Sequence, residues 1–226
     1  MTAVMSIVVA TTNRGKLAEI RALLGDLAVE VLSPCDALSE VPNVIEDGDT
    51  FEANALKKAR LIAAESMMLT LADDSGLVVD ALGGRPGVRS ARFASEGATD
   101  GENNAELLRQ MCELGDELRA ARFRCAIALV DPWSAEGDEI VVEGSCEGSI
   151  AHQPTGTGGF GYDPLFVVAG QERTMAELSE DEKNQISHRA KALAKLQPKL
   201  AAIVEERLTT AARILSTPPP SAVSRK

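Results

Sequence analysis

The sequence contains few aromatic residues, only two histidines and no excess of positive charge. Aromatic residues make up 3% of the 226 residues, so stacking surfaces for nucleobases are scarce. The formal net charge is -11, which leaves no basic field to hold a nucleic-acid backbone by counterion release. We therefore expect no nucleic-acid partner. A small anion remains compatible with this charge, because a few local cations and a metal ion can bind phosphate inside an acidic protein.

The sequence also lacks paired cysteines, long apolar runs and a leader pattern. No CxxC pair and no histidine at metal-ligand spacing accompanies the four cysteines, so we expect reduced, mostly buried thiols at Cys35, Cys112, Cys125 and Cys146. The apolar run near the N-terminus has no preceding basic segment and no small-residue cleavage site. No later run approaches membrane-spanning length. We expect a cytoplasmic protein with no membrane partner.

What remains is an ordinary globular composition, with 45% hydrophobic and 25% charged residues in a chain long enough to bury a core. We expect a single domain over residues 1–215, with two lobes around a cleft. Three consecutive prolines lie in the C-terminal segment, and we expect a disordered tail over residues 216–226.

Alternating apolar patterns predict strands interleaved with helices, which is typical of an α/β or α+β fold with a mixed sheet. The turn at residues 132–138 predicts an antiparallel pairing of the strands that flank it. A capping box of Thr99 and Glu102 predicts a helix start, and Pro198 predicts a kink or a fresh helix start. We expect residues 30–49 to be irregular. Strands are expected over residues 5–10, 69–72, 77–82, 122–130, 139–143 and 165–168, and helices over 16–24, 50–62, after Thr99 and over about 186–215.

A polar loop that contains a glycine lies between the first expected strand and the first expected helix. Such a loop presents the unpaired N–H groups of a helix start to an anion. It is not a Walker A loop, because Ala10 replaces the upstream glycine and Leu17 stands where a hydroxyl is required. A phosphate cradle and a capped turn with a surface lysine are both open for this loop alone. Its residues are Thr11, Thr12, Asn13, Arg14, Gly15 and Lys16.

Two adjacent acids, Asp73 and Asp74, follow an expected strand and precede Ser75, while Glu46 lies in an earlier acidic segment together with Asp47. Carboxylates that converge from two segments suit Mg²⁺, which completes its shell with water and substrate phosphates. The alternative is a solvated turn, because aspartate, serine and glycine all favour turns.

The segment TGTGGFGYD, residues 155–163, formally contains GxGxxG. An apolar, strand-like run follows it where a dinucleotide-binding motif has a helix, so we discard that interpretation. Dense glycine brings the backbone close to a neighbouring group, and the ring of Phe160 is placed to cover a base. The alternative is a wide loop with Phe160 in the core.

A fourth cluster contains Lys183, Ser187, His188 and Arg189 at an expected helix start. Arginine only donates hydrogen bonds. It can therefore bind a base whose 6-oxo group accepts a hydrogen bond, and it disfavours a base whose 6-amino group donates one. The alternative is that Ser187 caps the helix while His188 and Arg189 lie in solvent. We interpret His152 as an ordinary loop residue.

Taken together, these segments resemble the inosine triphosphate pyrophosphatase family, and in particular its bacterial XTP/dITP diphosphatases. The resemblance covers the chain to about residue 200 and rests on five segments in order. These are ATTNRGK (residues 10–16), TFEANALKKA (50–59), ADDSGL (72–77), GTGGFGYDP (156–164) and ISHR (186–189). Thr12 stands where glycine is common in the family, and Ala53 stands where an acid is frequent.

The resemblance implies an elongated α/β fold with a cleft between two lobes, a homodimer, Mg²⁺ as cofactor, and release of pyrophosphate from ITP, dITP and XTP. It implies that the loop from Thr11 to Lys16 holds the triphosphate. It also implies that Asp74 activates water and binds metal with Glu46, while Lys16 absorbs the charge of the leaving pyrophosphate. Ser75 would contact substrate. Phe160, Gly161, Tyr162 and Asp163 would hold the base and sugar, and Lys183, His188 and Arg189 would recognise the purine.

Two rival functions are compatible with parts of the sequence. A Maf-type pyrophosphatase would prefer pyrimidine triphosphates, and the ISHR segment argues against it. A nucleotide-binding regulator without catalysis would gain nothing from Glu46, Asp73 and Asp74, because their charges repel a triphosphate.

Overall fold

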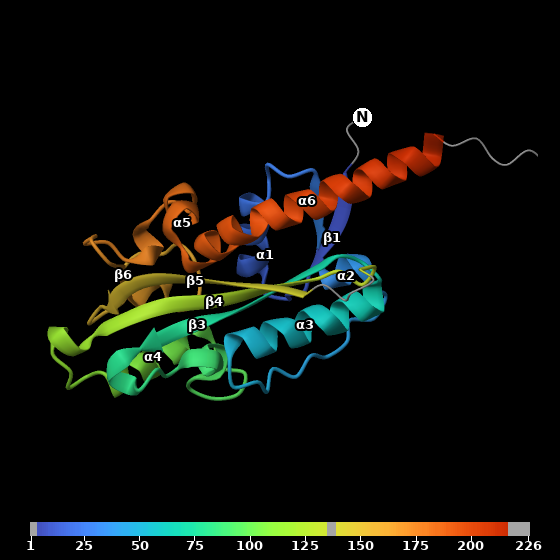
Figure 1. The fold of residues 1–226 in the computed structure, drawn as a ribbon. Coiled ribbons are helices and arrows are strands. Elements are labelled where there is room, and N and C mark those ends of the chain that lie inside the picture. The colour runs from blue at the N-terminus through green and yellow to red at the C-terminus, as the bar shows by residue number, and fades with distance from the viewer. Residues whose placement is uncertain (1–3, 135–138, 217–226) are drawn as a thin grey trace, which may run out of the picture.

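The computed structural model describes residues 4–134 and 139–216, and its centre is a six-stranded mixed sheet (Figure 1). The strand order is β2-β1-β3-β4-β5-β6, with parallel pairing among the first three strands and antiparallel pairing from β3 to β6. The strands are β1 (Met5–Val9), β2 (Val29–Leu32), β3 (Thr70–Val79), β4 (Ala120–Val130), β5 (Glu139–Ile150) and β6 (Phe166–Val168). The helices are α1 (Arg14–Leu23), α2 (Pro34–Ala37), α3 (Phe51–Ser66), α4 (Asp100–Gln110), α5 (Glu180–Ile186) and α6 (His188–Ser216).

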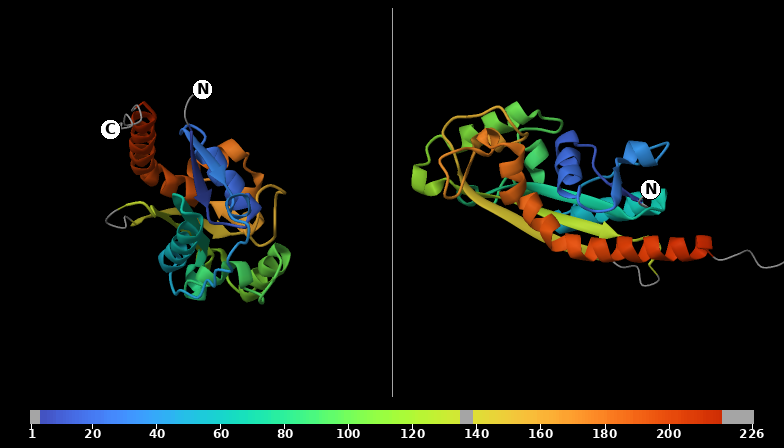
Figure 2. Two further views of the ribbon diagram at one scale, coloured as in Figure 1. Left: turned by 90° about the vertical axis from the view of Figure 1, so that its right-hand side faces the viewer. Right: turned by 90° about the horizontal axis from the view of Figure 1, so that it is seen from above.

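Successive residues of a strand face opposite sides of the sheet, and this alternation divides the core into two layers. On β4, Ile127 and Leu129 belong to a cluster with α1 and α6, whereas Ala126 and Ala128 belong to a cluster with α3. Figure 2 shows the same arrangement along the long strands, with α3 on one side and α1 and α6 on the other. The chain therefore buries both faces of the sheet, as expected for the α/β class.

The far ends of β3, β4 and β5 carry a second lobe with its own core. Leu77 and Phe123 from the strands pack there with Leu107 of α4 and with Leu165 and Phe166 near β6. In Figure 1, α4, α5 and β6 gather at this end of the sheet, away from β1 and β2. The expected elongated α/β fold with two lobes is confirmed.

Several predicted elements are confirmed by their terminal contacts. Thr50 caps α3 by accepting a hydrogen bond from the backbone N–H of Ala53, and Thr99 with Glu102 forms the expected capping box of α4. β4 and β5 pair antiparallel across the expected turn, although β5 extends to Ile150. The C-terminal helix α6 is continuous through Pro198, so it neither stops nor restarts there.

Other predictions were wrong. Residues 29–32 form the edge strand β2, within the region expected to be irregular, because they pair with β1. The segment Asp73–Gly76 was expected to separate two strands, but β3 is one strand from Thr70 to Val79, paired throughout with β4. Helix α5 precedes α6 and was not predicted.

Two further expectations concern the cysteines and the chain end. Of the four thiols, Cys125 and Cys146 are buried and Cys35 and Cys112 are exposed, so the expectation of mostly buried thiols holds for half of them. The expected tail begins inside α6 at Ser216, and residues 217–226 lie outside the described residues. Across the described ranges, no helix has the length and apolar character needed to cross a membrane.

Candidate active site

A cleft opens where β1 ends and β3 continues. The last pairing between these strands joins Val9 to Leu71, and the chain then leaves the sheet as the loop that leads to α1. Beyond Leu71 the edge of β3 is no longer paired with β1, and at its far end it contacts residues 85–90, where the backbone N–H of Leu77 donates to the hydroxyl of Ser90. A cavity of about 340 Å³ and a second of about 110 Å³ lie along this edge, and both are lined by Lys16 and Ser75. The candidate site is this continuous cleft between the lobes.

The loop before α1 contains both a cap and free donors. Asn13 caps the helix by accepting the backbone N–H of Lys16 at 3.0 Å, and its own N–H donates to the hydroxyl of Thr11. Within the described part of the chain, the N–H groups of Thr12, Arg14 and Gly15 have no partner. The capped-turn alternative is thus correct for the backbone, but free donors remain for an anion.

Lys16 is not a surface lysine, because its ammonium lies 2.7 Å from a carboxylate oxygen of Asp73. Asp73 is fully buried and also accepts hydrogen bonds from Arg189 and from the hydroxyl of Ser75. Burial alone raises the pKa of Asp73, but Arg189 and Lys16 outweigh burial and hold this pKa far below its ordinary value. Asp73 is therefore an ionised structural acid whose oxygens are already occupied.

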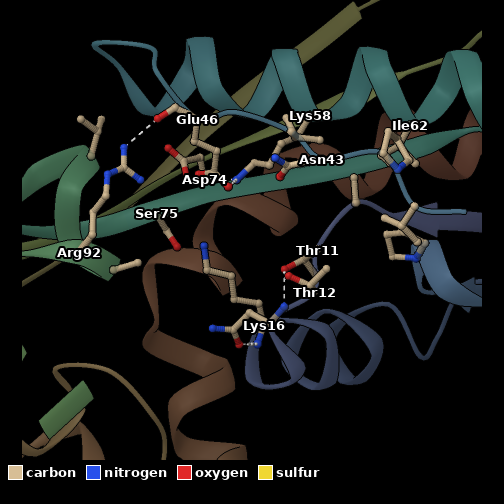
Figure 3. A pocket seen from close by; sticks show the side chains of 18 residues that line it. Thr11, Thr12, Lys16, Asn43, Glu46, Lys58, Ile62, Asp74, Ser75 and Arg92 are labelled. Carbon is tan, nitrogen blue, oxygen red and sulfur yellow. Dashed lines mark hydrogen bonds and ion pairs between the residues drawn. The ribbon is translucent and has the colours of Figure 1, made fainter. Parts of the chain in front are cut away.

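Asp74 faces the other side of β3, as the alternation along the strand requires. Its oxygens accept from the amide of Asn54 at 3.2 Å and from the ammonium of Lys58 at 3.1 Å, both on α3. Lys58 also lies 3.2 Å from Glu46, which comes from the loop before α3. Figure 3 shows Asp74, Glu46 and Lys58 together on the α3 side of β3, with Lys16 reaching toward the strand from the opposite side.

The loop that carries Glu46 is held at two further points. Arg92 donates to the carbonyl oxygen of Glu46 at 2.7 Å, the contact drawn in Figure 3. The side-chain Oδ1 of Asn54 accepts a hydrogen bond from the backbone N–H of Gly48 at 2.8 Å, while its side-chain Nδ2 donates to Asp74. One asparagine thus fixes the distance between the Glu46 loop and the Asp74 strand.

The paired carboxyl groups of Glu46 and Asp74 have unequal proton affinities. Burial and the neighbouring Glu46 raise the pKa of Asp74 to about 6, although Lys58 and Lys16 oppose the shift. Burial also raises the pKa of Glu46, but Lys58 outweighs it and leaves that pKa below its ordinary value. Each carboxyl group thus shifts the pKa of the other, and Asp74 is the one with the higher proton affinity.

These residues fit a hard divalent cation that is completed by a phosphate ligand. Glu46 and Asp74 come from separate segments and lie 3.2 Å and 3.1 Å from the same ammonium of Lys58, so two hard oxygen donors meet at one place and suit a divalent cation. Asp73 is unavailable because its oxygens are occupied. Over residues 4–134 and 139–216, no group of three or more His, Cys, Asp or Glu is arranged to hold a metal. Water and phosphate would therefore complete the shell.

The second cavity is lined by the glycine loop and by α5 and α6. Phe160 is half-buried on the cavity wall, so the alternative that places it in the core is wrong. Its backbone N–H donates to Asp163 at 3.0 Å, and the ammonium of Lys183 lies 4.8 Å from its ring centre. Tyr162 is buried and donates its hydroxyl to the carbonyl of Ser90.

Lys183 is ion-paired on both sides, at 2.6 Å from Asp163 and 2.6 Å from Glu19 of α1. Burial lowers its pKa, but these two acids outweigh burial and raise the pKa above its ordinary value. The 110 Å³ cavity therefore presents a permanently charged ammonium.

His188 and Arg189 are buried at the start of α6, so the alternative that places them in solvent is wrong. Arg189 is 1% exposed and donates to Asp73, to Ser75 and to Glu19, which leaves at most one of its N–H groups free. His188 stacks on Phe123 at 5.0 Å, and burial together with Arg189 lowers its pKa well below the ordinary value. Among the described residues, its Nδ1 is a buried nitrogen without a hydrogen-bond partner.

Sequence reasoning missed three residues that contact the side chains of the site: Glu19, Asn54 and Lys58. The signal was present for each. Asn54 and Lys58 are polar residues four apart on the apolar face of α3, and Glu19 lies one helical turn after Lys16 on α1. A polar side chain on a face that packs into the core needs a partner, and that requirement points to a site.

Most of the expected site residues line one of the two cavities. The 340 Å³ cavity contacts Thr11, Thr12, Asn13, Lys16, Glu46, Asp74 and Ser75. The 110 Å³ cavity contacts Asn13, Lys16, Ser75, Phe160, Gly161, Tyr162, Asp163, Lys183, His188 and Arg189. Arg14 is exposed and lines neither, and Gly15 lies beneath Phe160, beside a third cavity of about 270 Å³.

Proteins of known name and structure resemble this chain over most of its length. The model of the Ham1 family matches residues 7–199. A dITP/XTP pyrophosphatase from Geobacter sulfurreducens is 52% identical over 194 residues, which are 86% of this chain and 96% of the relative. A dITP/XTP pyrophosphatase from Geobacillus kaustophilus is 50% identical over 198 residues, 88% of this chain and 95% of the relative. The solved structure of a HAM1 protein from Coxiella burnetii superimposes with a TM-score of 0.78 at 42% identity, covering 88% of this chain and 99% of that chain.

Proposed function

The chain belongs to the Ham1 family, and from this premise we propose that it hydrolyses ITP, dITP and XTP to the monophosphate and pyrophosphate. Relatives about half identical to it carry the name dITP/XTP pyrophosphatase. One observation carries the proposal. A single cleft joins free helix N–H groups and Lys16, the carboxyl pair of Glu46 and Asp74, and a cavity walled by Phe160. A triphosphate, a reacting phosphorus and a base each have a matching part of this cleft.

Asp74 is the group that we assign to the activation of water. A general base works best with a pKa near the working pH, and burial with Glu46 raises the pKa of Asp74 to about 6. Asn54 and Lys58 hold its carboxylate from α3, so its orientation is fixed before substrate enters. In this role Asp74 accepts the proton of a water that attacks the α phosphorus.

Lys16 and the start of α1 receive the phosphates. The free N–H groups of the loop and the helix dipole favour negative charge. Lys16 borders both cavities, so it lies between the carboxyl pair of the 340 Å³ cavity and the Phe160 wall of the 110 Å³ cavity. It neutralises charge that develops on the leaving pyrophosphate.

We propose Mg²⁺ as the cofactor, held by Glu46 and Asp74 and completed by water and phosphate oxygens. When bound there, Mg²⁺ supplies charge neutralisation on the phosphates and polarisation of the phosphorus. The chain contributes the two carboxylates, and Lys58 sets their separation through its contacts with both.

Base selection belongs to the second cavity. Phe160 offers a face for stacking, and neutral His188 has an unpartnered ring nitrogen. Arg189 has at most one free donor, which suits a single acceptor such as the 6-oxo group of a deaminated purine. An adenine 6-amino group would present a donor to a donor and would be rejected.

We further propose that the protein is a homodimer. We also propose that it acts in the cytoplasm, on the deaminated purine nucleotides of the nucleotide pool. Trp133 is 61% exposed beside the exposed Met67, whose carbonyl oxygen accepts its indole N–H at 2.8 Å. This apolar pair supports a contact with a second copy. Size-exclusion chromatography with light scattering tests the dimer, and a monomer mass at micromolar concentration would contradict it. Immunolocalisation in the source cell tests the cytoplasm, and a signal confined to another compartment would contradict that assignment.

The test of the reaction is pyrophosphate release from ITP, XTP, GTP, ATP and TTP, each with and without Mg²⁺ at mildly alkaline pH. We expect release from ITP and XTP only with Mg²⁺, and little from ATP or GTP. Preference for TTP would favour the Maf-type alternative. Tight binding of ITP without turnover would favour a nucleotide-binding regulator.

A further inference from the structure

Helix α4 holds the glycine loop at the residue next to Phe160. The carboxylate of Asp100 accepts the backbone N–H of Gly161 at 2.7 Å, and the side-chain amide of Asn104 donates to the carbonyl oxygen of Gly161 at 2.9 Å. These two residues lie one turn apart on α4 and about sixty positions from Gly161 in sequence. Both peptide groups of one glycine are therefore bound by a single helix.

These contacts fix the direction of the Phe160 ring. Gly161 has a φ of 62°, a conformation that glycine adopts freely, so nothing in its own side chain restrains it. The N–H held by Asp100 belongs to the peptide that joins Phe160 to Gly161. On the other side, the N–H of Phe160 is held by Asp163. With both flanking peptides fixed, the Cα–Cβ bond of Phe160 has a fixed direction, toward the 110 Å³ cavity that the ring lines.

The contact made by Asn104 is kept although it leaves a polar atom unsatisfied. Within the described ranges, Oδ1 of Asn104 is buried and has no hydrogen-bond partner. A buried unpaired acceptor lowers stability. Turning the amide over would place Oδ1 against the carbonyl of Gly161. The bond to Gly161 is therefore made at the cost of one unsatisfied oxygen on the same side chain.

We propose that Asp100 and Asn104 are positioning residues that set base selection by holding Gly161, and through it Phe160, in place. This proposal deepens the proposed function and rests on it. Both side chains contact the glycine loop, and Asp100 also lines the 110 Å³ cavity beside Phe160, so their effect is expected on the base. The phosphate loop and the carboxyl pair are held by α1 and α3 instead.

The experiment compares four variants: Asp100→Ala, Asp100→Asn, Asn104→Leu and, as control, Glu113→Ala. Asp100→Ala removes the acceptor, whereas Asp100→Asn keeps an acceptor oxygen but loses the charge. Asn104→Leu removes the donor and the unsatisfied oxygen together. Glu113 is an exposed acid just after α4 that makes no contact with the loop. Calorimetry measures the affinity for IMP and for inorganic triphosphate, hydrogen exchange measures the glycine loop without ligand, and turnover of ITP and ATP is measured separately.

We expect Asp100→Ala and Asn104→Leu to weaken IMP binding about fivefold to tenfold, as the loss of one hydrogen bond predicts, with triphosphate binding unchanged. Exchange at the Gly161 amide accelerates in Asp100→Ala, and the ITP to ATP preference falls while kcat for ITP stays within about twofold. Asp100→Asn and Glu113→Ala behave like the original chain. The melting temperature of Asn104→Leu stays within about 2 °C.

Three results would overturn the proposal. Equal IMP affinity in Asp100→Ala and the original chain would show that the contact does not position the base. Equal losses in Asp100→Asn and Asp100→Ala would assign the effect to the acidic charge at the start of α4. Equal losses of IMP and triphosphate affinity would mean a general loosening of the lobe. Absence of ITP turnover in the original chain, with the IMP pattern as expected, would contradict the proposed reaction alone.

Discussion

The ammonium of Lys16 lies 2.7 Å from the buried carboxylate of Asp73, so the first helix is tied to the central strand at the point where the cleft opens. This contact explains why the pKa values of two adjacent acids, Asp73 and Asp74, shift in opposite directions. Asp73 is neutralised by Lys16 and Arg189 and cannot take up another cation, whereas the pKa of Asp74 is raised by burial and by the neighbouring Glu46. We therefore expect substitution of Asp73 to lower stability and substitution of Asp74 to lower turnover.

Asp73→Asn is expected to lower the free energy of unfolding by about 3 kcal/mol, because Lys16 and Arg189 then carry buried charge with less compensation. Urea unfolding without added metal measures this change. A loss below about 0.5 kcal/mol would show that the ion pairs of Asp73 contribute little.

Asp74→Asn is expected to leave the free energy of unfolding unchanged or slightly higher, since removal of the Asp74 charge relieves repulsion from Glu46. Turnover of ITP should fall at least about a hundredfold while nucleotide binding persists, because the general base is lost and the shape is kept. Steady-state kinetics and calorimetry on the same preparation measure both effects. Near-normal turnover would remove Asp74 from its assigned role.

Arg189→Ala is expected to weaken the preference for ITP over ATP more than it lowers kcat for ITP. The variant should also be less stable by about 3 kcal/mol, because Asp73 loses a buried partner. Arg189→Lys is the matched comparison, since one ammonium keeps the charge but cannot reach Asp73, Ser75 and Glu19 together. If the ITP preference survives in Arg189→Ala, base recognition belongs to His188 and Lys183.

Gly15→Ala tests the contact between the two loops. A Cβ at Gly15 would lie 2.5 Å from Cδ1 of the Phe160 ring, so the ring must move. We expect the KM for ITP to rise about tenfold, while helix propensity keeps the free energy of unfolding equal or higher. Gly101→Ala is the control, because its nearest atom, the hydroxyl of Thr99, is 4.0 Å away. Unchanged KM in Gly15→Ala would mean that the ring position is irrelevant to binding.

His188 predicts a loss of stability in mild acid. Burial and Arg189 lower the pKa of His188 well below 6.5, so below that pH the unfolded chain binds a proton that the folded chain does not. The free energy of unfolding then falls as pH falls, by up to about 1.4 kcal/mol per pH unit. From pH 6.5 to pH 5 we expect the original chain to lose about 2 kcal/mol more than His188→Asn. NMR of His152→Asn, which retains one imidazole, should show no titration over this range, and a titration near 6.5 would contradict the prediction.

The sequence predicted helices α1, α3, α4 and α6, the strand β4 and most residues that line the cleft, but it missed α2 and α5 and misjudged the acidic pair. Aspartate and glycine are depleted in strands, so Asp73–Gly76 was expected to interrupt β3. Long-range partners override that tendency, because Lys16, Arg189, Asn54 and Lys58 satisfy both carboxylates within the strand. Those partners lie 16 to 116 positions away, where no local pattern reveals them.

The edge strand β2 was missed for a related reason. Its four residues include Glu30, and among the strands that the structure describes they pair with β1 alone. A short edge strand is defined by pairing more than by its own apolar pattern. By contrast, the free N–H groups before α1 follow from local helix chemistry, and the sequence located that loop correctly.

The alternation of β3 has a consequence for how this site tolerates change. Asp73 and Asp74 are adjacent in sequence but lie on opposite faces of the strand. Asp73 is held in ion pairs that stabilise the fold, whereas Asp74 faces α3 and lines the cleft. A one-residue deletion just before Asp73 that shifted the strand register would turn each acid to the opposite face of the sheet. The ion pairs of Asp73 and the contacts of Asp74 would then both be lost. Insertions between motifs leave this phase intact, so the loops are free to lengthen while the spacing inside the strand is not.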